Sequence, residues 1–141
     1  MYIATLLEGR GDVVTVTPDQ TVQSVVDILV KHRIGAVLVL EGDAIAGILS
    51  ERDVVRCLSS HGPGILNGPA RDIMTKDVVT ITKRETNVAA LANMTRRRIR
   101  HLPVVEDARL IGIVSIGDIV KSRIEEAERE AESLKDYIQH A

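Results

Sequence analysis

The chain has 141 residues, a formal net charge of −2 and one cysteine. This length suits one compact domain or two small halves that share a core, and the charge gives no general attraction to nucleic acid or to an anionic membrane. A single cysteine excludes a disulfide framework and a thiolate metal site, and the histidines show no metal-ligand spacing. No stretch is long and apolar enough to span a bilayer and no signal-peptide pattern is present, so we expect a soluble cytoplasmic protein without a metal.

Aromatic side chains are almost missing from the sequence, since Tyr2 and Tyr137 are the only two. The core must therefore be built from aliphatic residues. A nucleobase cannot be held by stacking on Phe or Trp, so any recognition of a base would have to come from the backbone.

The chain repeats itself at an offset of 65 positions (77 minus 12), because residues 12–53 align with residues 77–118 without a gap. The segment DVVTVT at 12–17 meets DVVTIT at 77–82. One repeat alone is too short to bury much apolar surface, so we expect the two to fold together about a pseudo-twofold axis. Whatever one repeat offers a ligand, the other offers again, and the differences between them indicate where the chemistry has specialised.

Each repeat carries signals in the order strand–helix–strand–strand–helix, which predicts an α/β fold of α+β character. Short β-branched runs indicate the strands, and threonines at N-cap positions mark the first helix of each repeat. The predicted strands are 13–16, 36–40 and 44–50 in the first repeat and 78–81, 102–105 and 110–115 in the second. The predicted helices run from Thr21 to Lys31 and from Thr86 to Arg97, and a second helix follows Ser50 and Ser115.

These signals divide the chain into four parts. We place the first repeat at 1–60, a linker rich in Gly and Pro at 61–75, the second repeat at 76–121 and a C-terminal helical extension at 122–141. The linker is expected to end in a short helical turn over 70–74.

An apolar seam follows the final helix beyond the end of the second repeat. It consists of Val120, Ile124, Ala127, Ala131, Leu134 and Ile138. Steps of four and three residues alternate along it, which is the spacing of a coiled coil. Two interpretations stay open: the helix packs along its own domain, or it pairs with a second copy across a dimer.

The pattern Gly-apolar-apolar-Ser-X-X-Asp occurs twice, each time where a strand meets a helix. Its simplest interpretation is helix capping, with Ser50 and Ser115 accepting from first-turn amides and Asp53 and Asp118 favouring the positive end of the helix dipole. A ligand can use the same geometry, because a helix N-terminus offers donors to phosphate and a carboxylate there can accept from both hydroxyls of a ribose. Recurrence at equal register favours this second use in addition to the first.

The turn from helix into strand differs between the repeats. The first repeat has RIGA at 33–36, whereas the second has RRRIRH at 96–101. Cations at the end of a helix are favourable and solvated, which explains the first two arginines of the second turn. Arg100 and His101 lie past the helix, where the first repeat has only Gly-Ala. This predicts an anion nearby, with Arg100 gripping it and His101 adding a donor.

Longer motifs carry a family resemblance. They are TVTP at 15–18, HRIGAV at 32–37 and GILSERD at 47–53 in the first repeat, and DIMT at 72–75, RIRHLPVV at 98–105 and GIVSIGD at 112–118 in the second. Each repeat resembles the cystathionine-β-synthase-type (CBS) domain, and the pair resembles a Bateman module. The resemblance covers nearly the whole chain, which is similar to small proteins made of a CBS pair alone.

The resemblance implies an adenosine-containing ligand in the cleft between the repeats, namely AMP, ADP, ATP or NAD(H), with S-adenosylmethionine as the alternative. It implies that the ligand-binding residues are Thr17, Ile34, Gly35, Ala36, Ser50, Arg52, Asp53, Thr82, Ile99, Arg100, His101, Ser115, Ile116, Gly117 and Asp118. In this assignment the aspartates hold the ribose, the serines line the sugar–phosphate region, and the two helix-to-strand turns read the adenine edge through their backbone. The threonines lie beside the nucleoside, Arg100 and His101 contact phosphate, and Arg52 can join them opposite the small Gly117.

The two half-sites are expected to be unequal, because Gly35 and Ala36 bring no charge and Glu51 adds a negative one. We therefore predict one strong site and one weak or empty site, without a preference for Asp53 or Asp118.

Three classes of function compete. The leading one is a regulatory module, homodimeric as CBS pairs usually are, that senses an adenine nucleotide and controls an unidentified partner protein. An enzyme is not expected, because the chain has no phosphate loop with lysine, no nucleophile–base pair and no metal cluster, and hence no catalytic cofactor. Nucleic-acid binding through residues 96–101 is the lower alternative, since the chain is acidic overall and lacks stacking aromatics.

Overall fold

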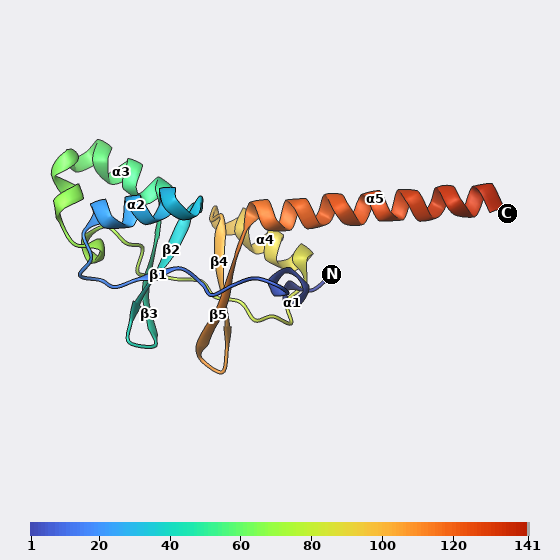
Figure 1. Cartoon of the computed structure of the whole chain (residues 1–141), viewed down its shortest axis with the longest axis horizontal. Coiled ribbons are helices and arrows are strands. Elements are labelled where there is room, and N and C mark those ends of the chain that lie inside the picture. Colours follow the sequence, from blue (N-terminus) through green and yellow to red (C-terminus); the bar gives the residue numbers. More distant parts are fainter. Residues whose placement is uncertain (141) are drawn as a thin grey trace.

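The structure, a computed structural model, describes residues 1–140 as two α/β units side by side with one long helix projecting from the second unit (Figure 1). The first unit contains β1 (Thr15–Val16), α2 (Val22–His32), β2 (Ala36–Glu41), β3 (Ala44–Ser50) and α3 (Glu51–His61). The second contains α4 (Asn87–Arg97), β4 (His101–Glu106), β5 (Arg109–Ser115) and α5 (Ile116–His140). A short helix, α1 (Ile3–Leu7), precedes the first unit, and two 3-10 turns, η1 (Pro63–Asn67) and η2 (Ala70–Asp72), join the units. The predicted α/β tandem with an extended C-terminal helix is confirmed.

Each unit has its own aliphatic core beneath an antiparallel hairpin. In the first, β1 runs parallel to β2 and β2 pairs antiparallel with β3, so the sheet order is β1-β2-β3. In the second, β4 and β5 form the equivalent hairpin. The first core contains Val16, Val22, Val25, Val37, Val39 and Leu49, and the second contains Ile81, Ala90, Met94, Leu102, Val104 and Ile119. None of these residues is aromatic, as the scarcity of aromatics in the sequence requires.

The first strand of each repeat is shorter than predicted. Of residues 13–16, only Thr15 and Val16 form a strand. Of residues 78–81, only Ile81 pairs with a strand, in a single parallel bridge to Val104. A β-branched composition favours an extended backbone but does not say where a partner strand is available, and here the partner is available only at the end of each run.

The helix ends follow their capping chemistry. The hydroxyl of Thr21 accepts from the Ser24 N–H at 3.1 Å, and that of Thr86 accepts from the Ala89 N–H at 3.1 Å, so both predicted N-caps are confirmed. Arg33 and Arg98 end these helices in the left-handed conformation, each with a φ of 54°. The chain reverses at these two arginines and enters β2 and β4.

The segments that precede the two repeats are exchanged between them. Ile3 of α1, absent from the predicted elements, is fully buried in the core of the second repeat, and its N–H donates to the Glu85 carbonyl at 2.9 Å. Thr75, at the end of the linker, pairs instead with Ile48 of the first repeat through backbone bonds of 2.8 and 2.9 Å. Each repeat is therefore completed by residues that lie before the other repeat in the sequence.

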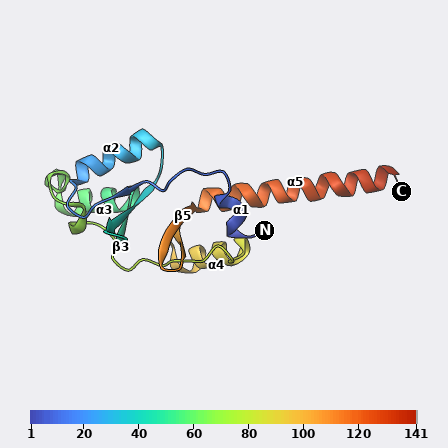
Figure 2. The same cartoon turned by 60° about the horizontal axis from the view of Figure 1, so that its bottom comes forward.

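The C-terminal helix α5 has two different parts. Near its start, Ile119 and Ser122 are buried against the second repeat. Beyond Glu126 every described residue is exposed, and the helix leaves the body as a straight rod in both views (Figures 1 and 2). The interpretation in which the whole helix packs along its own domain is therefore wrong for residues 127–140, because no part of the body lies beside them.

Replacing Gly47 by alanine should destabilise the fold. A Cβ at this position would lie 2.7 Å from Met74 Sδ and 2.8 Å from the Thr75 carbonyl oxygen, where the exchanged segment crosses β3. Overpacking of this kind costs about 1–3 kcal/mol, which urea unfolding measures. The control is Gly64→Ala, whose Cβ would meet no atom within 4 Å. Equal unfolding midpoints for the two variants would contradict the close approach.

Candidate functional site

Two cavities lie between the repeats, and each takes parts from both. We name them after their aspartates. The Asp118 cavity, of about 460 Å³, is lined by Leu7, Arg10–Val14, Arg33–Ala36, His101, Ile111–Ile113, Ser115 and Asp118. The Asp53 cavity, of about 270 Å³, is lined by Gly35, Ile48, Ser50–Asp53, Arg56, Thr75, Asp77–Val79, Arg98–His101 and Pro103. In each cavity the Ser-X-X-Asp motif of one repeat faces the helix-to-strand turn of the other, as expected for repeats related by a pseudo-twofold axis.

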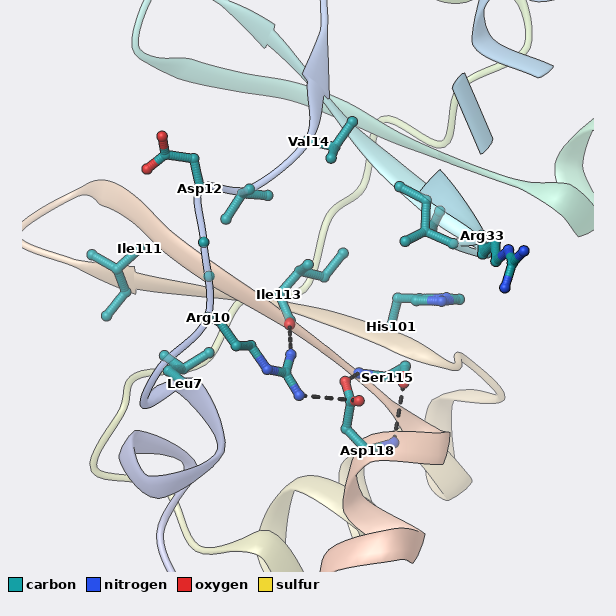
Figure 3. A pocket seen from close by; sticks show the side chains of 16 residues that line it. Leu7, Arg10, Asp12, Val14, Arg33, His101, Ile111, Ile113, Ser115 and Asp118 are labelled. Atoms are coloured by element: carbon teal, nitrogen blue, oxygen red, sulfur yellow. Dashed lines mark hydrogen bonds and ion pairs between the residues drawn. The ribbon is translucent and has the colours of Figure 1, made fainter. Parts of the chain in front are cut away.

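Asp118 caps α5 and also meets the N-terminal segment (Figure 3). The Ser115 N–H donates to Asp118 Oδ2 at 2.8 Å, and the Asp118 N–H donates to Ser115 Oγ at 3.1 Å. Arg10 lies 3.0 Å from Asp118 Oδ1 and also donates to the Ile113 carbonyl at 3.0 Å. The Asp118 side chain keeps 31% of its surface exposed. Its carboxylate is therefore accessible from the cavity once Arg10 moves.

Asp53 is held more completely. Its Oδ2 accepts from the Ser50 N–H at 2.9 Å and from the Ser50 hydroxyl at 3.0 Å, while its Oδ1 accepts from Arg56 at 2.7 Å and from the Thr75 hydroxyl at 3.2 Å. Only 8% of its side-chain surface is exposed. The capping interpretation is confirmed at both aspartates, but Asp53 additionally ties the exchanged linker to the first repeat.

Charge is distributed unequally between the cavities. The Asp53 cavity is lined by four arginines, Arg52, Arg56, Arg98 and Arg100, against three carboxylates. The Asp118 cavity has two arginines and two carboxylates. The charges of an arginine and a carboxylate cancel when the two are paired, so the Asp118 cavity is balanced and the Asp53 cavity keeps one positive charge. A phosphate would be attracted to the Asp53 side.

His101 and Gly35 lie in the wall that the two cavities share. A Cβ on Gly35 would lie 2.9 Å from Glu51 Oε1 and 3.2 Å from His101 Nε2. The small residue of the first repeat thus makes room for the large one of the second. The sequence predicts an anion near His101 because the first repeat has only small residues at this turn. Packing of His101 against Gly35 is a second reason for the small residue, and it requires no anion.

The charge state of His101 follows from its surroundings. Burial lowers the pKa of His101, the Asp118 and Glu51 carboxylates partly counteract this shift, and the Arg100 guanidinium lowers the pKa further. The side chain is therefore biased toward the neutral form, which offers one N–H donor and one acceptor.

The cavities bring together most of the predicted residues and leave out four. Thr17 lines a separate hollow with Arg71 and Lys76. Thr82, Ile116 and Gly117 are not among the described residues that line either cavity. Thr17 and Thr82 lie past the point where the chain joins the sheet, so they are carried away from the cleft.

The residues that the sequence analysis missed come from the segments before each first strand. Asp12–Val14 line one cavity and Asp77–Val79 line the other. The sequence held a signal for them, because DVV is identical in the two repeats although little of it pairs in a sheet. Arg10 and Thr75 had no such signal, since their partners are set by the exchange of segments. Arg56 pairs with Asp53 one turn earlier in α3, a spacing that the sequence analysis did not use.

Other kinds of site find no support in the described residues. Among residues 1–140, no group of three or more His, Cys, Asp and Glu side chains is arranged to hold a metal ion. No helix in the described part of the chain is long and apolar enough to cross a membrane.

Comparison with known proteins agrees with this architecture. The family model described as the CBS domain matches residues 9–60 and 70–125. The mitochondrial CBS domain-containing protein CBSX3 of Arabidopsis thaliana is 38% identical over 128 residues, which are 87% of this chain and 62% of that protein. The chain thus spans less than two thirds of this curated relative.

Two solved structures share the fold. The CBS-domain containing protein ATU1752 from Agrobacterium tumefaciens is 40% identical, with a TM-score of 0.84 over 87% of this chain and 99% of that chain. The CBS domain pair of protein MJ0100, solved in complex with 5′-methylthioadenosine and S-adenosyl-L-methionine, is 24% identical, with a TM-score of 0.78 over 91% of this chain and 98% of that chain. The chain belongs to the CBS-domain family and contains two repeats of it.

The free energy of unfolding should decrease as the pH falls from 7.5 to 5.5, and part of this decrease should disappear in His101→Ala. Because the pKa of His101 is lowered in the fold, the unfolded chain takes up the proton first. The stability is thus fully present above the unfolded pKa and is lost as the pH falls toward the folded one. Alanine is the residue that the first repeat has at this position. Urea unfolding at several pH values measures the difference, and identical pH profiles for the two proteins would contradict a neutral His101.

Proposed function

We propose that this protein is a regulatory module that binds an adenosine-containing ligand in the cleft between its repeats, with the nucleoside in the Asp118 cavity. The observation that carries the proposal is the assembly of this cavity from Asp118 of one repeat and Arg33–Ala36 of the other. Its volume of about 460 Å³ falls in the usual range of small-molecule sites, whereas that of the Asp53 cavity, about 270 Å³, falls slightly below it.

The ribose and adenine contacts follow from accessibility. Asp118 is partly exposed, and its Oδ1 can accept from a ribose hydroxyl in place of Arg10. Both oxygens of Asp53 already accept from protein donors. The backbone at Ile34–Ala36 and at Val13–Val14 then faces the base. Recognition of adenine through backbone groups suits a chain that has no Phe or Trp.

The phosphates are directed toward the wall shared by the two cavities. His101 lies in that wall. Arg98 and Arg100 line the Asp53 cavity on the other side of the wall, and they contribute to its excess of positive charge. This polarity favours AMP, ADP, ATP or NAD(H). S-adenosylmethionine is the alternative, supported by the complex of MJ0100 and by the balanced charge of the Asp118 cavity itself.

Regulation requires that the ligand bind two states of the protein differently. The Arg10–Asp118 pair offers such a difference, because a ribose hydroxyl on Asp118 competes with Arg10. Arg10 belongs to the segment that joins α1 to β1, and α1 packs on β5 and on α5. Displacement of Arg10 would therefore be transmitted to the N-terminal segment and to the base of the projecting helix, where a regulated partner protein would detect it.

The protein is proposed to work as a homodimer and not as an enzyme. An apolar hollow on the outer surface between α2 and α3 contains Val30 and Val55, which are 73% and 66% exposed. Val120 of α5, at the position equivalent to Val55, is also exposed. These surfaces suit the homodimer that the family resemblance implies. Incubation with ATP or NAD should yield no product.

Nucleic-acid binding is the second candidate, because Arg96, Arg97 and Arg100 are exposed and lie close together in the sequence. Two of them are partly engaged, since Arg96 and Arg97 donate to Asn93 Oδ1. Oligonucleotide affinity that falls steeply with salt would favour this function over nucleotide sensing.

Calorimetric titration with AMP, ATP, NADH and S-adenosylmethionine tests the proposal when it is repeated on Asp118→Asn and Asp53→Asn. The amide keeps the size of the capping side chain and removes the charged acceptor. We expect Asp118→Asn to weaken the tightest ligand by about 10- to 100-fold, as for loss of a charge-assisted hydrogen bond, and Asp53→Asn to change it by less than about threefold. Equal losses in the two variants, or no binding of any of the four ligands, would contradict the assignment.

A further inference from the structure

The projecting part of α5 carries an apolar stripe that nothing in its own chain covers. In heptad notation, Ile124, Ala131 and Ile138 occupy a positions and Val120, Ala127 and Leu134 occupy d positions. Ile124, Leu134 and Ile138 are 53%, 61% and 67% exposed. Isolated exposed aliphatic residues are ordinary, but a stripe at heptad spacing over five turns is the pattern of a helix that pairs with another helix.

This stripe is not an extension of the surface that packs on the domain. From Ile119 onward, the residues of α5 that face the body are Ile119, Ser122 and Glu126. At 100° per residue, the a and d positions point about 120° away from them around the helix. The base of α5 can therefore stay on the second repeat while the stripe contacts a second chain.

The charges beside the stripe favour one orientation of that second chain. The e positions are Lys121, Glu128 and Lys135, and the g positions are Arg123, Glu130 and Tyr137. In a parallel pair, each g residue faces the e residue five positions later in the partner. Arg123 then meets the partner's Glu128 and Glu130 meets the partner's Lys135, so both contacts join opposite charges.

An antiparallel pair of the same helices is opposed by its charges. With the stripes fully overlapped, e positions face e positions and g positions face g positions. Lys121 then meets the partner's Lys135, Glu128 meets Glu128 and Glu130 meets Glu130 of the other chain. Each of these contacts joins like charges, so the same sequence that stabilises one orientation disfavours the other.

From this pattern we propose that two copies of this chain pair through their α5 helices as a parallel coiled coil in register. The proposal rests on the homodimer of the proposed function and specifies its orientation. A stripe of fewer than three heptads with two alanines in it is marginal by itself, so the contacts between the bodies hold the helices at high local concentration. The parallel orientation also brings the bases of both α5 helices, and with them both Asp118 cavities, to the same end of the assembly.

Reversal of one charge tests orientation because the two arrangements predict opposite signs. Lys135→Glu places glutamates opposite Glu130 in a parallel pair, but creates two Glu–Lys contacts with residue 121 in an antiparallel pair. We expect sedimentation equilibrium at low salt to show about tenfold weaker dimerisation of Lys135→Glu, since two exposed ion pairs are reversed. Arg129→Glu, an equal change of charge at an f position away from the stripe, is the matched control and should leave dimerisation within about twofold.

Complementary variants sharpen the test. Glu130→Lys should weaken dimerisation as Lys135→Glu does, and an equimolar mixture of the two variants should form heterodimers as tight as the wild type. In a Cys57→Ser background, Leu134→Cys should form a disulfide between two chains under mild oxidation, because identical d positions face each other only in the parallel register.

The outcomes separate this inference from the proposed function. Tighter dimerisation of Lys135→Glu, or cross-linking of Leu134→Cys only when Ile124→Cys is also present, would show an antiparallel pair and overturn the inference. Dimerisation unchanged in all variants would place the whole interface on the bodies and also overturn it. Nucleotide titration of the same variants reports on the Asp118 cavity independently, because residues 127–140 make no contact with it.

Discussion

The architecture depends on the exchange of the two segments that precede the repeats. Neither repeat is complete alone: the first is closed by the backbone pairing of Thr75 with Ile48, and the second by burial of Ile3 and its bond to Glu85. These contacts join residues far apart in the sequence, so each repeat depends on a segment that leads into the other. The same exchange draws residues 10–14 and 75–79 across the cleft, where they become walls of the two cavities. The contacts that complete the fold and the walls of the two cavities therefore have one origin.

The two cavities differ because the repeats depart from symmetry around a shared scaffold. The scaffold of strand, cap and carboxylate is repeated, but the residues around it are not. Asp53 is saturated by Ser50, Arg56 and Thr75, while Asp118 meets Ser115 and a single arginine from outside its repeat. An aspartate with four protein donors holds the fold together, whereas one whose main partner can move is suited to bind a ligand.

Local chemistry in the sequence was sufficient to predict most of the elements. The caps at Thr21 and Thr86, both hairpins and the Ser-X-X-Asp junctions depend on neighbours within a few residues, and the structure has them where the patterns indicated. The offset of 65 residues also predicted two matching half-sites. The first strands were overestimated because pairing needs a partner edge that composition does not reveal. The contacts of Arg10 and Thr75 could not be predicted because they follow from the exchange of segments. The departure of Thr17 from the cleft follows from the point at which β1 joins the sheet, which composition also does not reveal.

In the proposed function, one ligand contacts both repeats and the exchanged segment that contains Arg10. Nuclear magnetic resonance of the isotope-labelled full chain titrated with the tightest adenosine ligand tests it most directly. We expect the amide signals of residues 10–14, 34–36, 101 and 115–118 to shift together with one dissociation constant. Shifts confined to a single repeat, or centred on the Asp53 cavity with Arg10 unaffected, would contradict it.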